Sequence, residues 1–110
     1  MINYEDFEKV DIRVGRVLSA DEFPEGRYSS HILKIDFGKE VGIKKSLARL
    51  TPNYKGPELV GKLVSAVVNF PPKQIGTHFS EVLTLGFSDE NGDCILIFPG
   101  KDIPLGGKLH

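Results

Sequence analysis

Apolar and polar residues alternate over several short stretches of the chain, and this two-residue period is typical of half-buried β-strands. The first stretch covers residues 10–17, where the alternation slips at Gly15 and predicts a β-bulge that bends the strand. The second covers residues 33–37 and ends at Gly38. A weaker pattern over residues 41–50 predicts a third strand.

Further strands are predicted in the second half of the chain. Residues 63–70 are nearly all apolar and β-branched, which indicates a strand buried on both faces. Residues 82–87 and 94–98 are apolar runs on either side of Asn91-Gly92, a strong hairpin signal, so we expect them to pair.

Short helices and loops separate the predicted strands. Residues 4–10 have an acidic first turn and predict a helix with Asn3 as its N-cap. Residues 51–60 predict a helical connection between the third and fourth strands. Loops are expected at residues 23–27 and 71–79.

This order of elements favours a mainly β fold. A bent strand with a glycine bulge favours a small closed barrel, and a five-stranded Greek-key barrel with a helix after its third strand is the OB-fold. An SH3-like barrel or an open α+β sheet fits the composition almost as well. The 110 residues predict a single domain over residues 1–110, with short N- and C-terminal extensions to the barrel.

Charge is distributed unevenly along the chain. The formal net charge is −1, yet residues 41–80 hold six basic residues against Glu58 alone. The segments before and after this middle third each carry a net charge of −3. A positive middle third in a nearly neutral chain predicts an anion-binding face on one side of the protein.

The residues that could support catalysis or metal binding show no suitable pattern. Cys94 is the only cysteine and lies in an apolar run, which predicts an unreactive core thiol. The three histidines lack the spacing of a metal site, and no glycine-rich loop joins a strand to a helix. We therefore expect no enzyme activity, no cofactor and no metal.

Neither a membrane segment nor a signal peptide is predicted. The longest apolar run, residues 94–98, has five residues, whereas a membrane helix needs ~20. The first six residues are acidic and lack the basic and apolar regions of a signal peptide. These features predict a cytoplasmic protein.

Several blocks of the sequence resemble one known family. Residues 10–17 (VDIRVGRV) are similar to the opening of the tRNA-binding domain shared by methionyl-tRNA synthetase C-terminal extensions and EMAP-II-type cytokine precursors. Residues 69–76 (NFPPKQIG) and 80–86 (SEVLTLG) resemble that family's basic loop and its following serine-led strand. The chain resembles the free-standing CsaA-like branch more closely, and the members of this branch are similar to secretion chaperones. This resemblance lies in residues 36–38, 42–44, 67–72 and 80–83. The resemblance implies an OB-fold, tRNA binding without catalysis, and a homodimer.

Cations beside the third predicted strand are the first candidate contacts to nucleic acid. Lys44, Lys45 and Arg49 are interpreted as phosphate contacts, with a solvated strand face as the alternative. On a regular strand Lys45 and Arg49 share one face, and Lys44 lies on the other. Arg13, Arg27 and Tyr28 are weaker candidates, and Arg13 has Asp11 and Asp36 as alternative partners.

The loop before the serine-led strand supplies the second set of candidates. OB-folds bind single strands with a cationic groove and aromatic platforms. Lys73 suits a phosphate, and His78 or Phe79 suits a base. The alternatives are that Phe79 plugs the barrel bottom and that His78 is merely exposed. The candidates in this segment are Asn69, Lys73, Gln74, His78, Phe79 and Ser80.

A peptide-binding, export-related chaperone is the competing hypothesis. It would use an apolar groove between two subunits, with Phe23, Tyr28 or Phe79 as anchors, and its ligands would be unfolded or export-bound polypeptides.

A homodimer is also expected from the last predicted strand. Residues 94–98 are apolar on both faces, so both faces need cover. The tail from Pro99 to His110 and a second copy of the chain would cover the outer face. The alternative within one chain is that the helix at residues 4–10 packs over Leu96 and Phe98.

Overall fold

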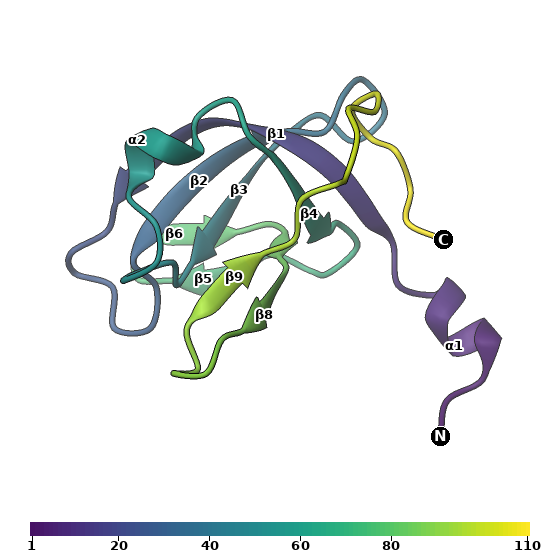
Figure 1. Cartoon of the computed structure of the whole chain (residues 1–110), viewed down its shortest axis with the longest axis horizontal. Helices are drawn as coiled ribbons and strands as arrows, with labels where there is room; N and C mark the ends of the chain where they lie inside the picture. The colour runs from purple at the N-terminus through teal and green to yellow at the C-terminus, as the bar shows by residue number, and fades with distance from the viewer.

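The computed structural model describes residues 1–110 and shows a five-stranded antiparallel barrel with two short helices and two small hairpins (Figure 1). The barrel strands follow the order β3-β2-β1-β4-β7, and β7 returns beside β3 so that the barrel is nearly closed. This arrangement confirms the mainly β fold and the OB-type barrel. The elements are α1 (Tyr4–Glu8), β1 (Ile12–Glu22), β2 (His31–Asp36), β3 (Ile43–Ala48), α2 (Gly56–Leu59), β4 (Leu63–Val67), β5 (Lys73–Ile75), β6 (His78–Ser80), β7 (Leu83–Thr84), β8 (Gly86–Ser88) and β9 (Cys94–Leu96).

Strand β1 bends around the barrel, but its bulge is not where the sequence pattern predicts. The register with β2 shifts at Leu18, whereas Gly15 pairs in register with Val64 of β4. A Cβ atom on Gly15 would lie 2.5 Å from Cγ2 of Ile35 and 2.7 Å from Cδ1 of Phe37. Because both neighbours are fully buried, the glycine provides room for close packing inside the barrel.

The core fills the barrel and reaches under α2. Strand β4 ends at Val67, earlier than predicted, but its burial on both faces is confirmed because every residue except Ser65 is buried. Only the last turn of the predicted helix at residues 51–60 is helical, and its Leu59 joins the core. The core cluster comprises Val17, Leu33, Ile35, Phe37, Leu50, Leu59, Val64, Ala66, Val82 and Leu96.

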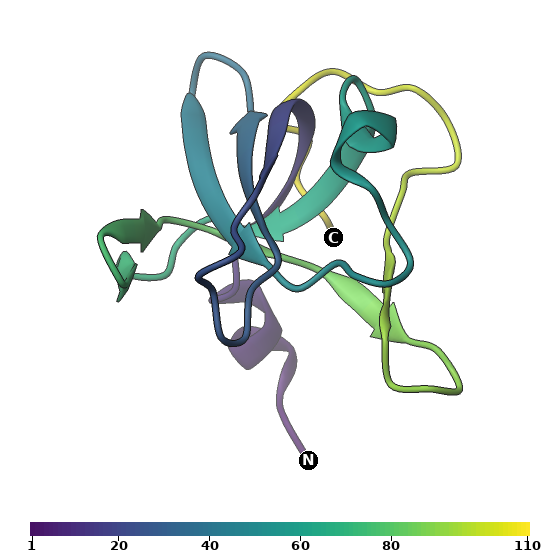
Figure 2. The ribbon, with the colours of Figure 1, turned by 90° about the vertical axis from the view of Figure 1, so that its left-hand side faces the viewer.

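The second half of the chain differs most from the predictions. The predicted loop at residues 71–79 contains the hairpin β5–β6, and the predicted strand at residues 82–87 is divided into β7 and β8. The hairpin around Asn91-Gly92 is confirmed as β8–β9, although β9 ends at Leu96. Figure 2 shows the two hairpins projecting on opposite sides of the barrel.

Both ends of the chain lie near the start of β1 but are held differently. Residues 106–109 run antiparallel to β1, with hydrogen bonds from the Gly106 N–H to the Val14 carbonyl (2.9 Å) and from the Leu109 N–H to the Ile12 carbonyl (2.8 Å). Helix α1 has no buried residue and lies away from the barrel in Figures 1 and 2. The hypothesis that this helix covers Leu96 is therefore wrong, since Leu96 is buried in the barrel core instead.

Candidate nucleic-acid interface

A groove with a volume of about 680 Å³ lies on the outside of the barrel, between residues 27–29, β3 and the segment from residue 70 to residue 83. OB-folds bind oligonucleotides at the same place, on the face of strands two and three and between the two flanking loops. We call this site the groove. Its apolar floor is made by Leu47, Phe70, Ile75, Val82 and Leu83.

The rim of the groove carries the polar groups. Arg27 and Tyr28 lie on one side, with the guanidinium 6.0 Å from the centre of the Tyr28 ring, a distance suited to a cation–π contact. Lys73 and Gln74 of β5 lie on the other side, and Glu81 is the one acidic residue of the lining. Arg27 and Tyr28, the weaker candidates, thus join Lys73 and Gln74 at one site.

The register between β2 and β3 decides which lysines face outward. Lys45 pairs with Lys34, whereas Lys44 pairs with Ile35 of the core. Paired residues of an antiparallel sheet share a face, so Lys44 and Lys45 lie on opposite faces as predicted. The Lys44 ammonium lies 4.0 Å from the Glu81 carboxylate, and because the two side chains are 36% and 35% exposed, this ion pair constrains Lys44 only weakly.

Lys34 is a candidate that the sequence analysis missed. It is exposed on β2 and shares the outer face with Lys45. The signal was present, because Leu33 and Ile35 alternate with it and face the core. The sequence pattern does not show strand pairing, and only the pairing of β2 with β3 places Lys34 opposite Lys45.

Arg49 lies just beyond the end of β3, outside the groove. Its side chain is 69% exposed, and its guanidinium lies 3.9 Å from the Asp93 carboxylate. An ion pair of this length and exposure constrains the guanidinium only weakly. Arg49 and Arg27 line a second, smaller pocket next to the groove.

The β5–β6 hairpin presents Gln74 and Phe79 as cross-strand partners. Phe79 is 49% exposed, so the alternative that it plugs the barrel is wrong. His78 is only partly buried, and its ring meets the ring of Phe23 edge-on at 5.4 Å. Phe23 itself is 4% exposed, which excludes it as an anchor for a bound peptide.

Ser80 and Glu81 close the barrel against β3, and we call this junction the seam. The Leu47 N–H donates to Oγ of Ser80 (3.1 Å), and the Lys45 N–H donates to Oε1 of Glu81 (3.0 Å). In return the Glu81 N–H donates to the Lys45 carbonyl (2.8 Å). The Ser80 hydroxyl is thus engaged within the fold, since it also donates to the Val82 carbonyl.

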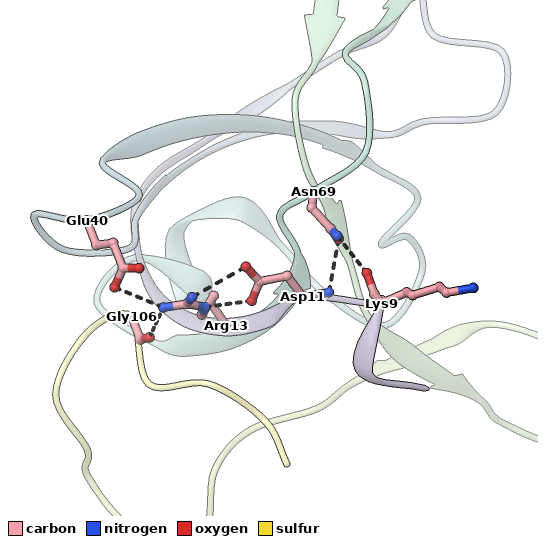
Figure 3. A network of polar contacts seen from close by, with 6 residues as sticks. All are labelled: Lys9, Asp11, Arg13, Glu40, Asn69 and Gly106. Carbon is pink, nitrogen blue, oxygen red and sulfur yellow. Dashed lines mark hydrogen bonds and ion pairs between the residues drawn. The ribbon is translucent and has the colours of Figure 1, made fainter. Parts of the chain in front are cut away.

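Asn69 and Arg13 belong to a polar network that fixes the N-terminal segment (Figure 3). The Asn69 side chain accepts from the Asp11 N–H (3.0 Å) and donates to the Lys9 carbonyl (2.8 Å). Arg13 pairs with Asp11 (2.6 Å) and Glu40 (3.2 Å), and these two carboxylates raise the pKa of its guanidinium. Arg13 also donates to the Gly106 carbonyl. Arg13 therefore has Asp11, and not Asp36, as its partner.

Substituting Asn69 tests whether it acts as a clamp or as an RNA contact. Asn69→Ala removes two side-chain hydrogen bonds, and we expect a loss of about 1–2 kcal/mol in unfolding free energy together with faster amide exchange in α1. If the chain binds tRNA as the sequence resemblance implies, the affinity should remain within about twofold of the wild-type value. An intact exchange pattern combined with weakened tRNA binding would restore Asn69 as a contact.

Two further observations concern the cysteine and the possible metal ligands. Burial raises the pKa of the Cys94 thiol, which disfavours the reactive thiolate. No group of three or more histidine, cysteine or acidic side chains is arranged to hold a metal ion. No helix has the length and hydropathy to cross a membrane.

Comparison with known proteins gives a consistent result. A family model described as "Putative tRNA binding domain" matches residues 12–108. The methionine–tRNA ligase of Pyrococcus horikoshii is 34% identical over 109 residues, and that of Nanoarchaeum equitans is 33% identical over 110 residues. These matches cover 99% and 100% of this chain but only 14% of each ligase.

Solved structures match over the whole chain. The chaperone CsaA of Bacillus anthracis is 44% identical with a TM-score of 0.90, and the CsaA chaperone protein of Picrophilus torridus is 45% identical with a TM-score of 0.91. The alignments cover 100% of this chain and 99% and 100% of those chains.

Proposed function

The chain belongs to the family of tRNA-binding domains, and from that membership we propose that it binds tRNA, without catalysing a reaction, through the groove and the basic face beside it. The observation that carries this proposal is the position of the groove on the OB-fold binding face, with cations on both its sides. The proposed domain extends over residues 1–110 and acts in the cytoplasm. Ligase activity is not included, because the chain corresponds to 14% of those enzymes.

Phosphate contacts would supply most of the affinity. The proposed phosphate ligands are Arg27 and Lys73 on the rim and Lys34 and Lys45 on the outer face of the sheet. Contacts of this kind release counterions and carry no sequence information. Tyr28, Phe70 and Phe79 are exposed aromatic side chains on which unpaired bases can stack.

Binding of unfolded polypeptides is the second candidate function. The apolar floor of the groove supports it, as does the likeness to two structures described as chaperones. Of the three anchors considered from the sequence, Tyr28 and Phe79 remain exposed. An extended peptide would place apolar side chains on Leu47 and Ile75 with little dependence on charge.

One pair of titrations separates the two functions. Deacylated tRNA and an unfolded polypeptide are each titrated against the pure protein at two salt concentrations. We expect the tRNA affinity to fall with salt, with a log–log slope of about −0.7 to −0.9 for each of three to five phosphate contacts. Absent or salt-independent tRNA binding would contradict the proposal, and tight, salt-insensitive polypeptide binding would favour the chaperone function.

The proposed assembly is a homodimer, supported by exposed apolar side chains on the β8–β9 hairpin. Phe87 and Ile95 are cross-strand partners and are 70% and 43% exposed. Phe98, Ile2 and Tyr4 are also exposed, at 43%, 73% and 71%. Patches of this kind are typical of interfaces between subunits.

Light scattering after size-exclusion chromatography tests the dimer. We expect twice the chain mass at micromolar concentration and one chain mass for the double variant Phe87→Ser, Ile95→Ser. The matched control is Val60→Ser combined with Ile43→Ser, two exposed apolar residues elsewhere, which should remain dimeric. A wild-type particle of one chain's mass would refute the dimer.

A further inference from the structure

The smaller pocket next to the groove is lined mainly by polar side chains, and most of them have no role in the phosphate contacts proposed above. It has a volume of about 320 Å³, at the lower end of the ~300–1,000 Å³ typical of small-molecule sites. We call it the polar pocket. Its polar side chains include Glu22, Arg27, Ser29, His31, Arg49 and Thr51.

His31 is a buried polar residue with one ring nitrogen left for a ligand. The residue is 2% exposed, and its Nδ1 lies 2.8 Å from Oγ of Ser30. The other nitrogen, Nε2, has no hydrogen-bond partner in the chain. No unpartnered side-chain nitrogen or oxygen is sealed from solvent, so Nε2 has access to solvent, and His31 lines the polar pocket. The chain offers Nε2 no partner, so water or a ligand supplies its hydrogen bond.

Arg27 and Arg49 contribute two guanidinium groups to the lining of the polar pocket. Arg49 has only the 3.9 Å contact with Asp93, and Arg27 is exposed and forms no ion pair. Their charge suits a phosphate group, which guanidinium binds in a bidentate manner. Glu22 lies in the same lining and would repel a second anion there.

We propose that the polar pocket takes one unpaired nucleotide of the RNA, with its phosphate between Arg27 and Arg49 and the edge of its base on Glu22 and His31. This inference rests on the proposed function and adds a base-selective subsite to it. A carboxylate accepts from an exocyclic amino group, as on C4 of cytosine, and uracil has no such group. The groove then supplies sequence-tolerant affinity, and the polar pocket supplies a preference at one position.

Titration of the full chain with mononucleotides, followed by NMR, tests the subsite. Cytidine monophosphate should shift the His31 ring signals and the Ser29 and Thr51 amides, with several-fold higher affinity than uridine monophosphate or inorganic phosphate. Equal effects of cytidine monophosphate and inorganic phosphate would overturn the proposal in favour of a simple anion site. Shifts confined to groove residues such as Leu47 and Phe70, or no shifts at millimolar concentration, would also overturn it.

A pair of variants tests the contact to the base. Glu22→Ala should lower the preference for cytidine over uridine monophosphate by about twofold to tenfold. Glu25→Ala removes the same charge from the adjacent loop but does not line the polar pocket, so it should leave the preference unchanged. A preference that survives Glu22→Ala, or falls equally in both variants, would contradict the assignment of Glu22.

A third variant separates the failure of this subsite from the failure of tRNA binding itself. Arg49→Gln should weaken cytidine monophosphate binding about tenfold while its fold is retained, because Arg49 is exposed and lines only the polar pocket. If wild-type protein binds tRNA with the expected salt dependence but Arg49→Gln changes nothing, only the subsite is wrong. If wild-type protein fails to bind tRNA at low salt, the proposed function is wrong.

Discussion

Replacing Arg27, Lys34, Lys45 and Lys73 together with Gln is expected to lower the affinity for tRNA about 100-fold or more at low salt. Each of these cations lies on the rim of the groove or on the outer face of β2 and β3. A hydrogen bond to a charged group contributes about 1.5–3 kcal/mol, and 1.4 kcal/mol is a factor of ten in affinity. The log–log dependence on salt should become shallower by about 3, because four counterion-releasing contacts are lost.

The control for this variant has the same net charge as the variant but loses its four cations elsewhere on the surface. Lys9, Lys39, Lys62 and Lys101 are exposed and line neither the groove nor the polar pocket, and their replacement with Gln removes four charges elsewhere. We expect this control to bind tRNA within a fewfold of wild type and with an unchanged salt slope. Equal losses in the two variants would mean that net charge alone governs binding and that the basic face is not a site.

Gly15→Val is expected to destabilise the barrel severely. A Cβ atom at this position would lie 2.5 Å from Ile35 and 2.7 Å from Phe37, and both side chains are fully buried. Overpacking of a dense core costs about 1–3 kcal/mol, and a branched side chain adds further atoms to this clash. Single domains have only about 5–15 kcal/mol of stability in total. Urea unfolding should show the loss as a lower midpoint with little change in slope.

Gly100→Ala provides the matched control for this substitution. A Cβ on Gly100 meets no atom within 4 Å, and its φ lies outside the left-handed region. Its unfolding midpoint should stay close to the wild-type value. A stable Gly15→Val protein would show that β1 has room to move away from β2, and the account of Gly15 as a packing residue would then be incorrect.

The sequence predicted those parts of the fold that depend on local pattern. Alternation over residues 33–37 located β2, and Asn91-Gly92 located the hairpin β8–β9. The hairpin β5–β6 was missed because strands of three residues are too short to show a period. The alternation slips at Gly15 and therefore predicted the bulge at that residue. The bulge lies at Leu18 instead, and Gly15 serves close packing.

The candidate site could be predicted only in part, because its geometry depends on partners distant in sequence. Asn69 bonds to a residue 58 positions away, and Arg13 to one 93 positions away. Nothing local in the sequence separates such clamping residues from ligand contacts. The alternation of side chains along a strand predicts that Lys44 and Lys45 lie on opposite faces. The contact of Lys44 with Glu81 could not be predicted, because it forms only where the barrel closes.

The seam also protects the protein from association through exposed backbone. Without residues 80–84, β3 would be an edge strand, and the N–H groups of Lys45 and Leu47 could donate hydrogen bonds to a strand of another chain. These two donors are satisfied by side chains, Glu81 and Ser80, rather than by a neighbouring backbone. The protection of this edge therefore depends on the identity of two partly buried residues, whereas a regular strand ladder depends only on backbone groups. A chain lacking both side chains would keep its core residues and the bond from the Glu81 N–H to the Lys45 carbonyl, but the N–H groups of Lys45 and Leu47 would lose their partners at this edge.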